Sequence, residues 1–318
     1  MSVHSSAITP RSGLLSAVPA GLAWGLLGVL AFSFTVPLTR VAIGGLDPLF
    51  IGAGRAVVAA ALATAALALT RQRLPRGRQW LRLGVVAGGA VAGFPLLTSY
   101  ALTEVPASHG AVVIAMLPAA TAVIVVLRTG ERPVRAFWLF AALGALAAVG
   151  FAALQGDGAG HVQRADVLLV IGVVVCALGY AEGGAVSREL GSWQTISWAL
   201  VLAAPVMVVL TATSLATHPP SASPTQWLCF GYLSCVSMFL GFFAWYRGLA
   251  IGPMAQVSQV QLAQPVLSIA WAGLLLGEPI TWLTVLGGLA VVACAAGASS
   301  SRRRSPVVPD RMAAKSAD

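Results

Sequence analysis

The sequence predicts an all-α polytopic membrane protein in which ten transmembrane helices form two inverted five-helix repeats. Hydrophobic residues make up 58% of its 318 positions and charged residues only 9%, against about 25% charged residues in soluble domains. Apolar stretches recur along the chain at close to the roughly 20 residues that span a bilayer. Backbone amides in lipid must bond internally and no alternating strand pattern is present, so the spans must be helices.

Short polar loops separate the apolar stretches and set the boundaries of the predicted helices. The ten helices are expected at 14–38, 48–69, 83–102, 107–127, 136–154, 166–185, 194–215, 227–246, 254–276 and 281–298. The chain then divides into an N-terminal cytoplasmic tail at 1–13, a first repeat at 14–155, an extracytoplasmic linker at 156–165, a second repeat at 166–299 and a basic, disordered tail at 300–318.

The distribution of Lys and Arg indicates the orientation, because basic residues in short loops are retained in the cytoplasm. If both termini are cytoplasmic, sixteen of the nineteen basic residues face the cytoplasm, Arg40 and Arg164 face outward, and Arg55 lies within the membrane. We therefore expect a multi-pass protein of the cytoplasmic membrane with both termini inside. The net charge of +9 follows from this topology and from a tail suited to anionic lipid headgroups, so we predict no nucleic-acid partner.

An internal repeat with an offset of 147 residues underlies the ten stretches. Tyr-Ala-Leu-x-x-Val-Pro-Ala-Ser at 100–108 corresponds to Arg-Gly-Leu-x-x-Gly-Pro-Met-Ala at 247–255, and Pro118 corresponds to Pro265. Each copy holds five helices, an odd number, so the second copy must enter the membrane upside down relative to the first. Inverted repeats of this kind are typical of secondary transporters.

Six short segments carry a resemblance to a known family, in an order and spacing that extend over about residues 18 to 298. They are Trp24-Gly25, the Gly-Leu-Asp-Pro of 45–48 that leads to Arg55, the block 99–108, Leu-Pro at 117–118, Gly-Glu-Arg-Pro at 130–133 and Gly-Glu-Pro at 277–279. With them the chain resembles the drug/metabolite transporter superfamily and, within it, the EamA-type permeases. The resemblance implies a ten-helix basket with a central cavity lined by helices 1, 3, 4, 6, 8 and 9. It also implies transport of amino acids, other metabolites or drugs, driven by a proton or solute gradient or by exchange.

Two ionisable side chains in the predicted helices are candidate sites, since charged groups in a membrane interior are costly and usually functional. Glu182, next to Tyr180 and several glycines, is interpreted as a cavity-facing proton carrier or a counter-ion for a substrate amine. The alternative is a glutamate that snorkels to the interface or pairs with Arg188. His109 is interpreted as a proton relay, because imidazole changes charge near neutral pH. The alternative for His109 is a hydrogen-bonded interfacial histidine.

Glutamines in helix 9 supply further candidates. Gln261 and Gln264 fall on one helical arc with Ser268, and Gln256 corresponds to His109 through the repeat. Polar groups facing lipid would lack partners, so this arc is expected to face the interior. The side chains are predicted to line the cavity and bind substrate or, alternatively, to form interhelical hydrogen bonds.

Three aromatic residues and one arginine complete the candidates for contact with a solute. Trp24, Tyr100 and Tyr180 are expected to present aromatic surface to an apolar part of the substrate, with helix packing and interfacial anchoring as the alternatives. Arg55 is expected to snorkel toward the outer interface or pair with Asp47. Contact with an anionic substrate is the other interpretation of Arg55.

Prolines and glutamates recur at repeat-equivalent positions. Pro118 and Pro265 each remove a helical hydrogen bond and are candidate hinges, with static kinks as the alternative. Glu131 and Glu278 precede prolines that start the next helix, and each is expected to cap a helix N-terminus there.

These observations predict a secondary transporter of a small organic metabolite, an amino acid or related amphiphile, exported by alternating access through the central cavity. A drug or another solute, carried in either direction, is the alternative within the same class. A non-transporting membrane sensor or an intramembrane enzyme is the alternative of a different class. No phosphate-binding loop of an ATPase is present, and the four histidines and four cysteines show no metal-binding spacing. We therefore predict no enzyme activity, no catalytic residues, no metal and no cofactor. The expected partners are the small-molecule substrate, membrane lipid and a proton or exchanged solute. The sequence gives no indication of the number of subunits.

Overall fold

The computed structural model describes residues 12–129, 134–155, 163–251 and 257–301, and these are almost entirely helical. In these ranges the helices form ten successive rods, which confirms the predicted all-α fold. The rods are α1 (Ser12–Ser33) with α2 (Thr35–Ile43); α3 (Pro48–Leu69); α4 (Arg78–Val86), η1 (Ala87–Gly93) and α5 (Phe94–Glu104); α6 (Ala107–Ile114) and α7 (Leu117–Thr129); α8 (Arg135–Gln155); α9 (Arg164–Leu190); α10 (Ser192–Thr217); α11 (Pro224–Tyr232), η2 (Leu233–Leu240) and α12 (Gly241–Ile251); η3 (Ser258–Leu262) and α14 (Ala263–Leu276); and α15 (Trp282–Ser301).

The lengths of the rods fit a membrane protein. Among the described residues, seven rods contain apolar helices of 22 to 28 residues, and three shorter apolar helices lie at Arg135–Phe151, Val260–Leu276 and Trp282–Ala298. A hydrocarbon core about 30 Å thick needs roughly 20 such residues. Below, the basic end is the end of the bundle that carries Arg82 and Arg128, and the opposite end is the one that carries Glu278.

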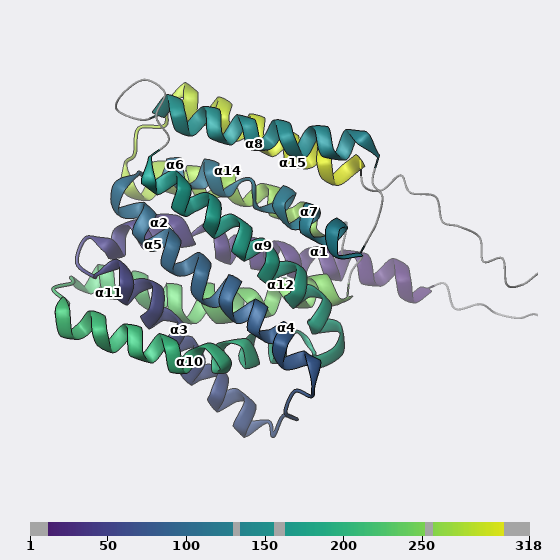
Figure 1. Cartoon of the computed structure of the whole chain (residues 1–318), viewed down its shortest axis with the longest axis vertical. Coiled ribbons are helices and arrows are strands. Elements are labelled where there is room, and N and C mark those ends of the chain that lie inside the picture. Colours follow the sequence, from purple (N-terminus) through teal and green to yellow (C-terminus); the bar gives the residue numbers. More distant parts are fainter. Residues whose placement is uncertain (1–11, 130–133, 156–162, 252–256, 302–318) are drawn as a thin grey trace, which may run out of the picture.

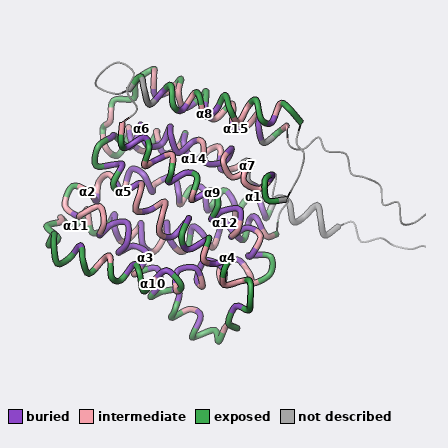
Figure 2. Tube along the Cα trace, viewed as in Figure 1, coloured by how far each residue is buried: buried purple, intermediate pink, exposed green. Residues whose placement is uncertain are grey.

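The helices α8 and α15 pack against each other and form a separate layer along one face of the bundle (Figure 1). Their outward faces are largely exposed (Figure 2), with leucines such as Leu139, Leu146, Leu286 and Leu289 more than half exposed. Both helices are apolar, so this face is suited to lipid. Each is the fifth helix of its repeat, which leaves four helices of each repeat to build the rest of the bundle.

The third helix of each repeat carries a π-helical stretch at an equivalent place. These stretches are η1 in the first repeat and η2 in the second, and residues 87 and 233, where they begin, are 146 positions apart. π-Helical turns are rare and occur mostly at functional sites. Their recurrence at the repeat spacing supports the two inverted repeats.

Prolines lie at breaks in three of the rods. Pro118 follows the junction of α6 and α7, and Pro265 follows the junction of η3 and α14. Proline has no N–H and so removes the hydrogen bond to the carbonyl four residues earlier. For Pro37 that carbonyl belongs to Ser33, and it accepts a hydrogen bond of 2.8 Å from the Ser268 hydroxyl instead. The first rod, expected to be one continuous helix, is therefore broken between α1 and α2 and joined to α14 at the break.

Two close helix crossings require glycine. A Cβ on Gly89 of η1 would lie 2.1 Å from the carbonyl oxygen of Val175 in α9, and a Cβ on Gly248 of α12 would lie 2.7 Å from the backbone nitrogen of Gly25 in α1. The first crossing joins helices 3 and 6, and the second joins their repeat equivalents, helices 8 and 1. The symmetry of the repeats thus extends from the sequence to the packing around the centre.

Candidate functional site

A small cavity lies at the centre of the bundle, where the π-helical stretches and the broken helices meet. Its volume is about 20 Å³, close to what one water molecule needs. Its lining residues are Phe32, Thr35, Val36, Arg55, Ala90, Phe94, Pro95, Leu117, Tyr180, Ser237, Met238, Phe242 and Gln264. A second space of about 10 Å³ shares Val36, Leu117 and Gln264 with the first and adds Pro118, Gln261, Pro265 and Ser268 among others. We call the two together the central cavity.

The aromatic wall of the central cavity follows the repeat symmetry. Phe32 of α1 and Tyr180 of α9 are 148 positions apart and stack with their ring centroids 6.4 Å apart. Phe94 and Phe242, also 148 positions apart, begin or lie near the start of the helices that follow η1 and η2. The Phe242 ring contacts Phe32 at 4.9 Å and Tyr180 at 5.8 Å. Equivalent residues of the two repeats therefore build one apolar surface.

The polar groups of the central cavity break this symmetry. Gln261 and Gln264 are buried, and the Nε2 atom of the first and the Oε1 atom of the second have no hydrogen-bond partner among the described residues. At an offset of 147, the equivalent positions in helix 4 are Ile114 and Leu117. One side of the cavity is thus polar where its counterpart is apolar, and this arrangement suits a solute with one polar and one apolar part.

Arg55 of α3 lines the central cavity and is only 2% exposed. The expectation that it snorkels to the interface or pairs with Asp47 is wrong. The Asp47 carboxylate accepts hydrogen bonds from the backbone N–H of Leu49 and from the Ser214 hydroxyl, so it caps α3 and joins it to α10. Among the described residues no carboxylate lies within 4 Å of the Arg55 guanidinium, and its Nε atom has no hydrogen-bond partner.

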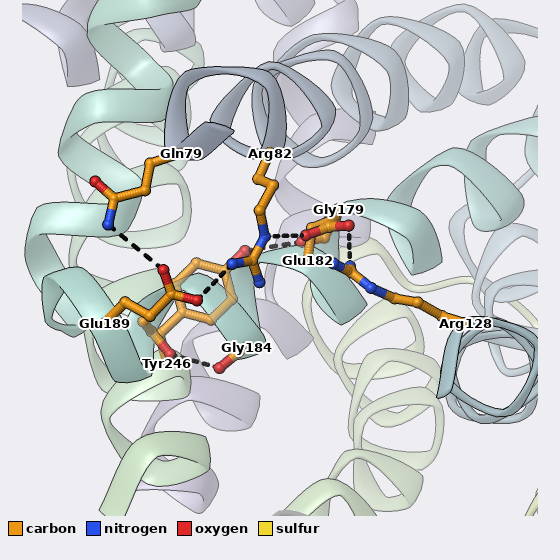
Figure 3. A network of polar contacts seen from close by, with 9 residues as sticks. Gln79, Arg82, Arg128, Gly179, Glu182, Gly184, Glu189 and Tyr246 are labelled. Atoms are coloured by element: carbon orange, nitrogen blue, oxygen red, sulfur yellow. Dashed lines mark hydrogen bonds and ion pairs between the residues drawn. The ribbon is translucent and has the colours of Figure 1, made fainter. Parts of the chain in front are cut away.

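An ion network joins the two repeats at the basic end (Figure 3). Glu182 of α9 accepts from Arg82 Nε of α4 at 2.9 Å and also pairs with Arg128 of α7. Two turns further along α9, Glu189 pairs with Arg82 and accepts from Gln79 Nε2 at 3.4 Å. One sequence-based alternative for Glu182 is an ion pair with Arg188. That partner is wrong, because Glu182 pairs with Arg82 and Arg128. Since Glu182 is not among the residues that line the central cavity, it lies between that cavity and the basic end as part of a contact between repeats.

A buried acid–histidine pair joins the repeats toward the opposite end. His109 Nε2 of α6 lies 2.6 Å from Asp166 Oδ1 of α9, and both side chains are at most 6% exposed. The His109 ring also contacts Phe151 of α8 at 5.2 Å between centroids. The other Asp166 oxygen accepts from the backbone N–H of Gln163, which precedes α9. The pair therefore fixes the start of helix 6 against the start of helix 4.

Glu278 caps a helix, but not the one that follows it in the chain. Its two carboxylate oxygens accept from the backbone N–H groups of Ala107 and Ser108, at 2.7 and 2.8 Å. These are the first residues of α6, so Glu278 of the second repeat caps helix 4 of the first. The expectation of a cap on the next helix is wrong because residues distant in sequence meet here. Glu131 lies outside the described residues.

Glu278→Gln should lower the free energy of unfolding by about 0.5–2 kcal/mol, the range for losing a helix N-cap. A glutamine amide retains one acceptor oxygen and presents an NH₂ group to the second backbone N–H. Thermal unfolding in detergent, followed by tryptophan fluorescence, measures the change. Glu104→Gln is the matched control, because the Glu104 carboxylate lies 4.0 Å from an exposed Arg164 and such pairs contribute little. Equal melting temperatures for the two variants would contradict the capping role.

The structure brings some predicted site residues to the central cavity and leaves others elsewhere. Tyr180, Gln261, Gln264, Pro118 and Pro265 line it. Trp24 instead packs edge-on against Phe243 at 5.8 Å, with the Arg247 guanidinium 5.5 Å from its ring centroid. Tyr100, near the end of α5, is 37% exposed. Gln256 lies outside the described residues.

Several residues of the site were missed by reasoning from the sequence. Phe94 and Phe242 carried a usable signal, since they are aromatic residues one repeat apart. Asp166, Arg82 and Arg128 carried none, because their partners come from other helices and no spacing in the sequence relates them. Hydroxyl pairs such as Thr35 with Ser237, 2.7 Å apart, are likewise visible only in three dimensions.

Contacts between the repeats lie on both sides of the central cavity. The ion network lies on the side of the basic end and the pair of His109 with Asp166 on the side of the opposite end. The central cavity lies between them and has room for about one water molecule. In the described part of the chain no three metal-ligating side chains lie together.

Comparison with known proteins agrees with this architecture. The family model described as the EamA-like transporter family matches residues 19–153 and again 163–300. The chain is 45% identical over 274 residues to the uncharacterized transporter YdeK of Bacillus subtilis, an alignment that covers 86% of this chain and 95% of that protein. A crystal structure of a protein 20% identical to this chain shares its fold with a TM-score of 0.62, over 90% of this chain and 99% of the other.

A more distant relative has a named solute. The chain is 27% identical over 303 residues to a probable terminal-alkyne amino-acid exporter of Streptantibioticus cattleyicolor, with 91% of this chain and 97% of that protein covered. The two family matches coincide with the two five-helix repeats and together span most of the chain. The protein therefore belongs to the EamA-like transporter family.

Proposed function

We propose that this protein exports an amino acid or a related amphiphilic metabolite as a secondary transporter, by alternating access through the central cavity. Family membership makes it a multi-pass membrane transporter and not an enzyme. The proposed solute is supported by the chemistry of the cavity, and export by the relative described as a probable amino-acid exporter. An amino acid with an apolar side chain has the same division into polar and apolar parts as the cavity wall.

The observation that carries the proposal is the combination of a symmetric aromatic wall with asymmetric polar groups. Phe32, Tyr180, Phe94 and Phe242 offer apolar surface, while Gln261 and Gln264 offer buried polar atoms without partners. A buried polar atom without a partner is costly, and a bound solute removes that cost. The relative described as an amino-acid exporter supports the same class of solute.

The proposed orientation in the membrane is supported by the distribution of charge. The basic end carries Arg82 and Arg128, and basic residues favour the cytoplasmic side. We therefore place the basic end and both chain termini in the cytoplasm. Transport is expected to be coupled to a proton or to an exchanged solute, with His109 and Glu182 as the candidate proton carriers.

Reconstituted protein tests the proposal. Proteoliposomes loaded with unlabelled amino acids, singly and in mixtures, should accumulate the corresponding labelled amino acid by counterflow, and an imposed pH gradient should change the rate if a proton is coupled. Empty liposomes give the background. Reporter tags at the N-terminus and near Gly160 should lie on opposite faces of the membrane. Counterflow at background for every amino acid, with drug-like or other solutes carried instead, would reject the proposed substrate class.

A further inference from the structure

We propose that the Arg55 side chain binds the carboxylate of the substrate inside the central cavity, while the Gln264 carbonyl oxygen accepts a hydrogen bond from the substrate's amino group. This inference rests on the proposed transport of an amino-acid-like solute and names the contacts that recognise it. It commits to a substrate with a free carboxylate, so amines without one are excluded as good substrates.

The charge of Arg55 is the first reason. A guanidinium stays protonated in proteins, and a charge buried in a membrane protein is costly unless it is paired. Arg55 is 2% exposed, and in the described ranges it has no carboxylate within 4 Å and an Nε atom without a partner. The nearest acid along the chain, Asp47, is occupied by the N-terminus of α3 and by Ser214. The missing anion is therefore expected from a ligand.

The position of Arg55 is the second reason. It lines the same space as Gln264 and the four aromatic rings of the cavity wall, so an anion at Arg55 lies beside both polar and apolar surface. A planar guanidinium can bind a carboxylate through two parallel hydrogen bonds. The Gln264 Oε1 atom is an acceptor without a partner, and a substrate ammonium group supplies donors. The two groups together match the two ends of a zwitterion.

The repeat supplies the third reason. At offsets of 147 and 148 the positions equivalent to Arg55 are Leu202 and Ala203, neither of which carries a charge. The scaffold of helix 7 therefore forms without an arginine at that place. A charge that the fold does not require in the second repeat, and that costs free energy in the first, is expected to serve binding.

Substrate analogues test the assignment in the intact protein. Two sets are used in counterflow with proteoliposomes: phenylalanine, phenylalaninamide, phenethylamine and 3-phenylpropionate, and leucine, leucinamide, 3-methylbutylamine and 4-methylpentanoate. The wild type should take up the amino acids at least tenfold faster than the amides and amines. As inhibitors of counterflow, the amino acids should likewise be at least tenfold more potent. Thermal stabilisation of the detergent-solubilised protein by the same compounds should follow the same order without requiring transport.

Variants separate recognition from folding. Arg55→Gln should lose at least tenfold in affinity for the amino acids, and its affinities for an amino acid and for the corresponding amide should lie within about twofold of each other. Arg55→Lys should retain part of the wild-type preference for the amino acid over the amide. Arg40→Gln is the matched control, because Arg40 donates to the Leu102 carbonyl at 2.7 Å and does not line the cavity; it should keep the wild-type preference. If Arg55→Gln does not fold, the comparison of acids with amides in the wild type decides.

The outcomes distinguish this inference from the proposed function. A wild type that carries neither set nor any other amino acid overturns both. A wild type that carries phenylalaninamide or leucinamide as well as the parent amino acid overturns the role of Arg55 and leaves amino-acid-like transport standing. An Arg55→Gln variant that keeps the tenfold preference for the amino acids over their amides also overturns the role of Arg55 and leaves amino-acid-like transport standing.

Discussion

Glu182→Gln should increase the exchange of backbone amides with solvent about tenfold at the basic end of α4, α7 and α9. The Glu182 carboxylate pairs with both Arg82 and Arg128 and so joins the two repeats. A neutral glutamine leaves the two guanidinium groups close together without the intervening negative charge. A tenfold change in population corresponds to about 1.4 kcal/mol, just below the roughly 1.5–3 kcal/mol expected for a hydrogen bond to a charged group. Hydrogen exchange with mass spectrometry, on protein in lipid nanodiscs, measures the opening.

Glu189→Gln is the control within the same network. Its carboxylate binds the same Arg82 but is 46% exposed, and solvent weakens such pairs. Exchange should therefore stay within about twofold of the wild type. If Glu182→Gln behaves like Glu189→Gln, the network does not hold the basic end closed. Counterflow by Glu182→Gln with an unchanged pH profile would argue separately against a proton carrier at this position.

Asp166→Ala should lower the free energy of unfolding by about 1.5–3 kcal/mol, because it leaves His109 without its buried acceptor. The Asp166 carboxylate also accepts from the Gln163 backbone, so the start of α9 loses its capping contact. Thermal or denaturant unfolding in detergent gives the change. His109→Ala and the double variant complete a thermodynamic cycle. A double variant whose loss equals the sum of the single losses would show that the two residues do not stabilise each other.

His109→Gln separates a structural role of this pair from a role in proton coupling. Glutamine is close in size and can donate to the Asp166 carboxylate, but it does not titrate. Stability should stay near that of the wild type. If His109 relays a proton, the dependence of counterflow on pH should flatten; a wild-type pH profile would leave His109 as a packing residue that holds helix 6.

The fold was predictable because its determinants are periodic and local. Apolar length fixed the ten helices, and Pro48 after Asp47 fixed the start of α3 at the expected residue. Pro118 and Pro265 indicated where helices 4 and 9 are interrupted. The third helix begins earlier than predicted, at Arg78, because Gly77 with φ near +49° ends the preceding loop. Polar residues in that first turn lie outside the apolar stretch and carried no signal of helix.

The site was less predictable because its contacts join helices far apart in sequence. Gln264 and Tyr180 were found as polar or aromatic residues inside apolar helices, and both line the central cavity. Trp24 has the same residue-level signal and packs against Phe243 instead. Composition cannot tell these cases apart, because the direction of a side chain depends on how a helix is rotated against its neighbours.

The two π-helical stretches also bear on the origin of the chain. A π turn accommodates one more residue than the α-helix around it, and the same surplus is found in η1 and in η2. A single insertion in a half-length ancestor, copied when the gene was duplicated, accounts for both. Pro95 follows η1, whereas Phe243 stands at the matching position after η2, so the distortion does not depend on proline. Deleting one residue from η1 or from η2 would convert that stretch to regular α-helix. The deletion would also rotate the rest of that helix by about 100° relative to the part before it.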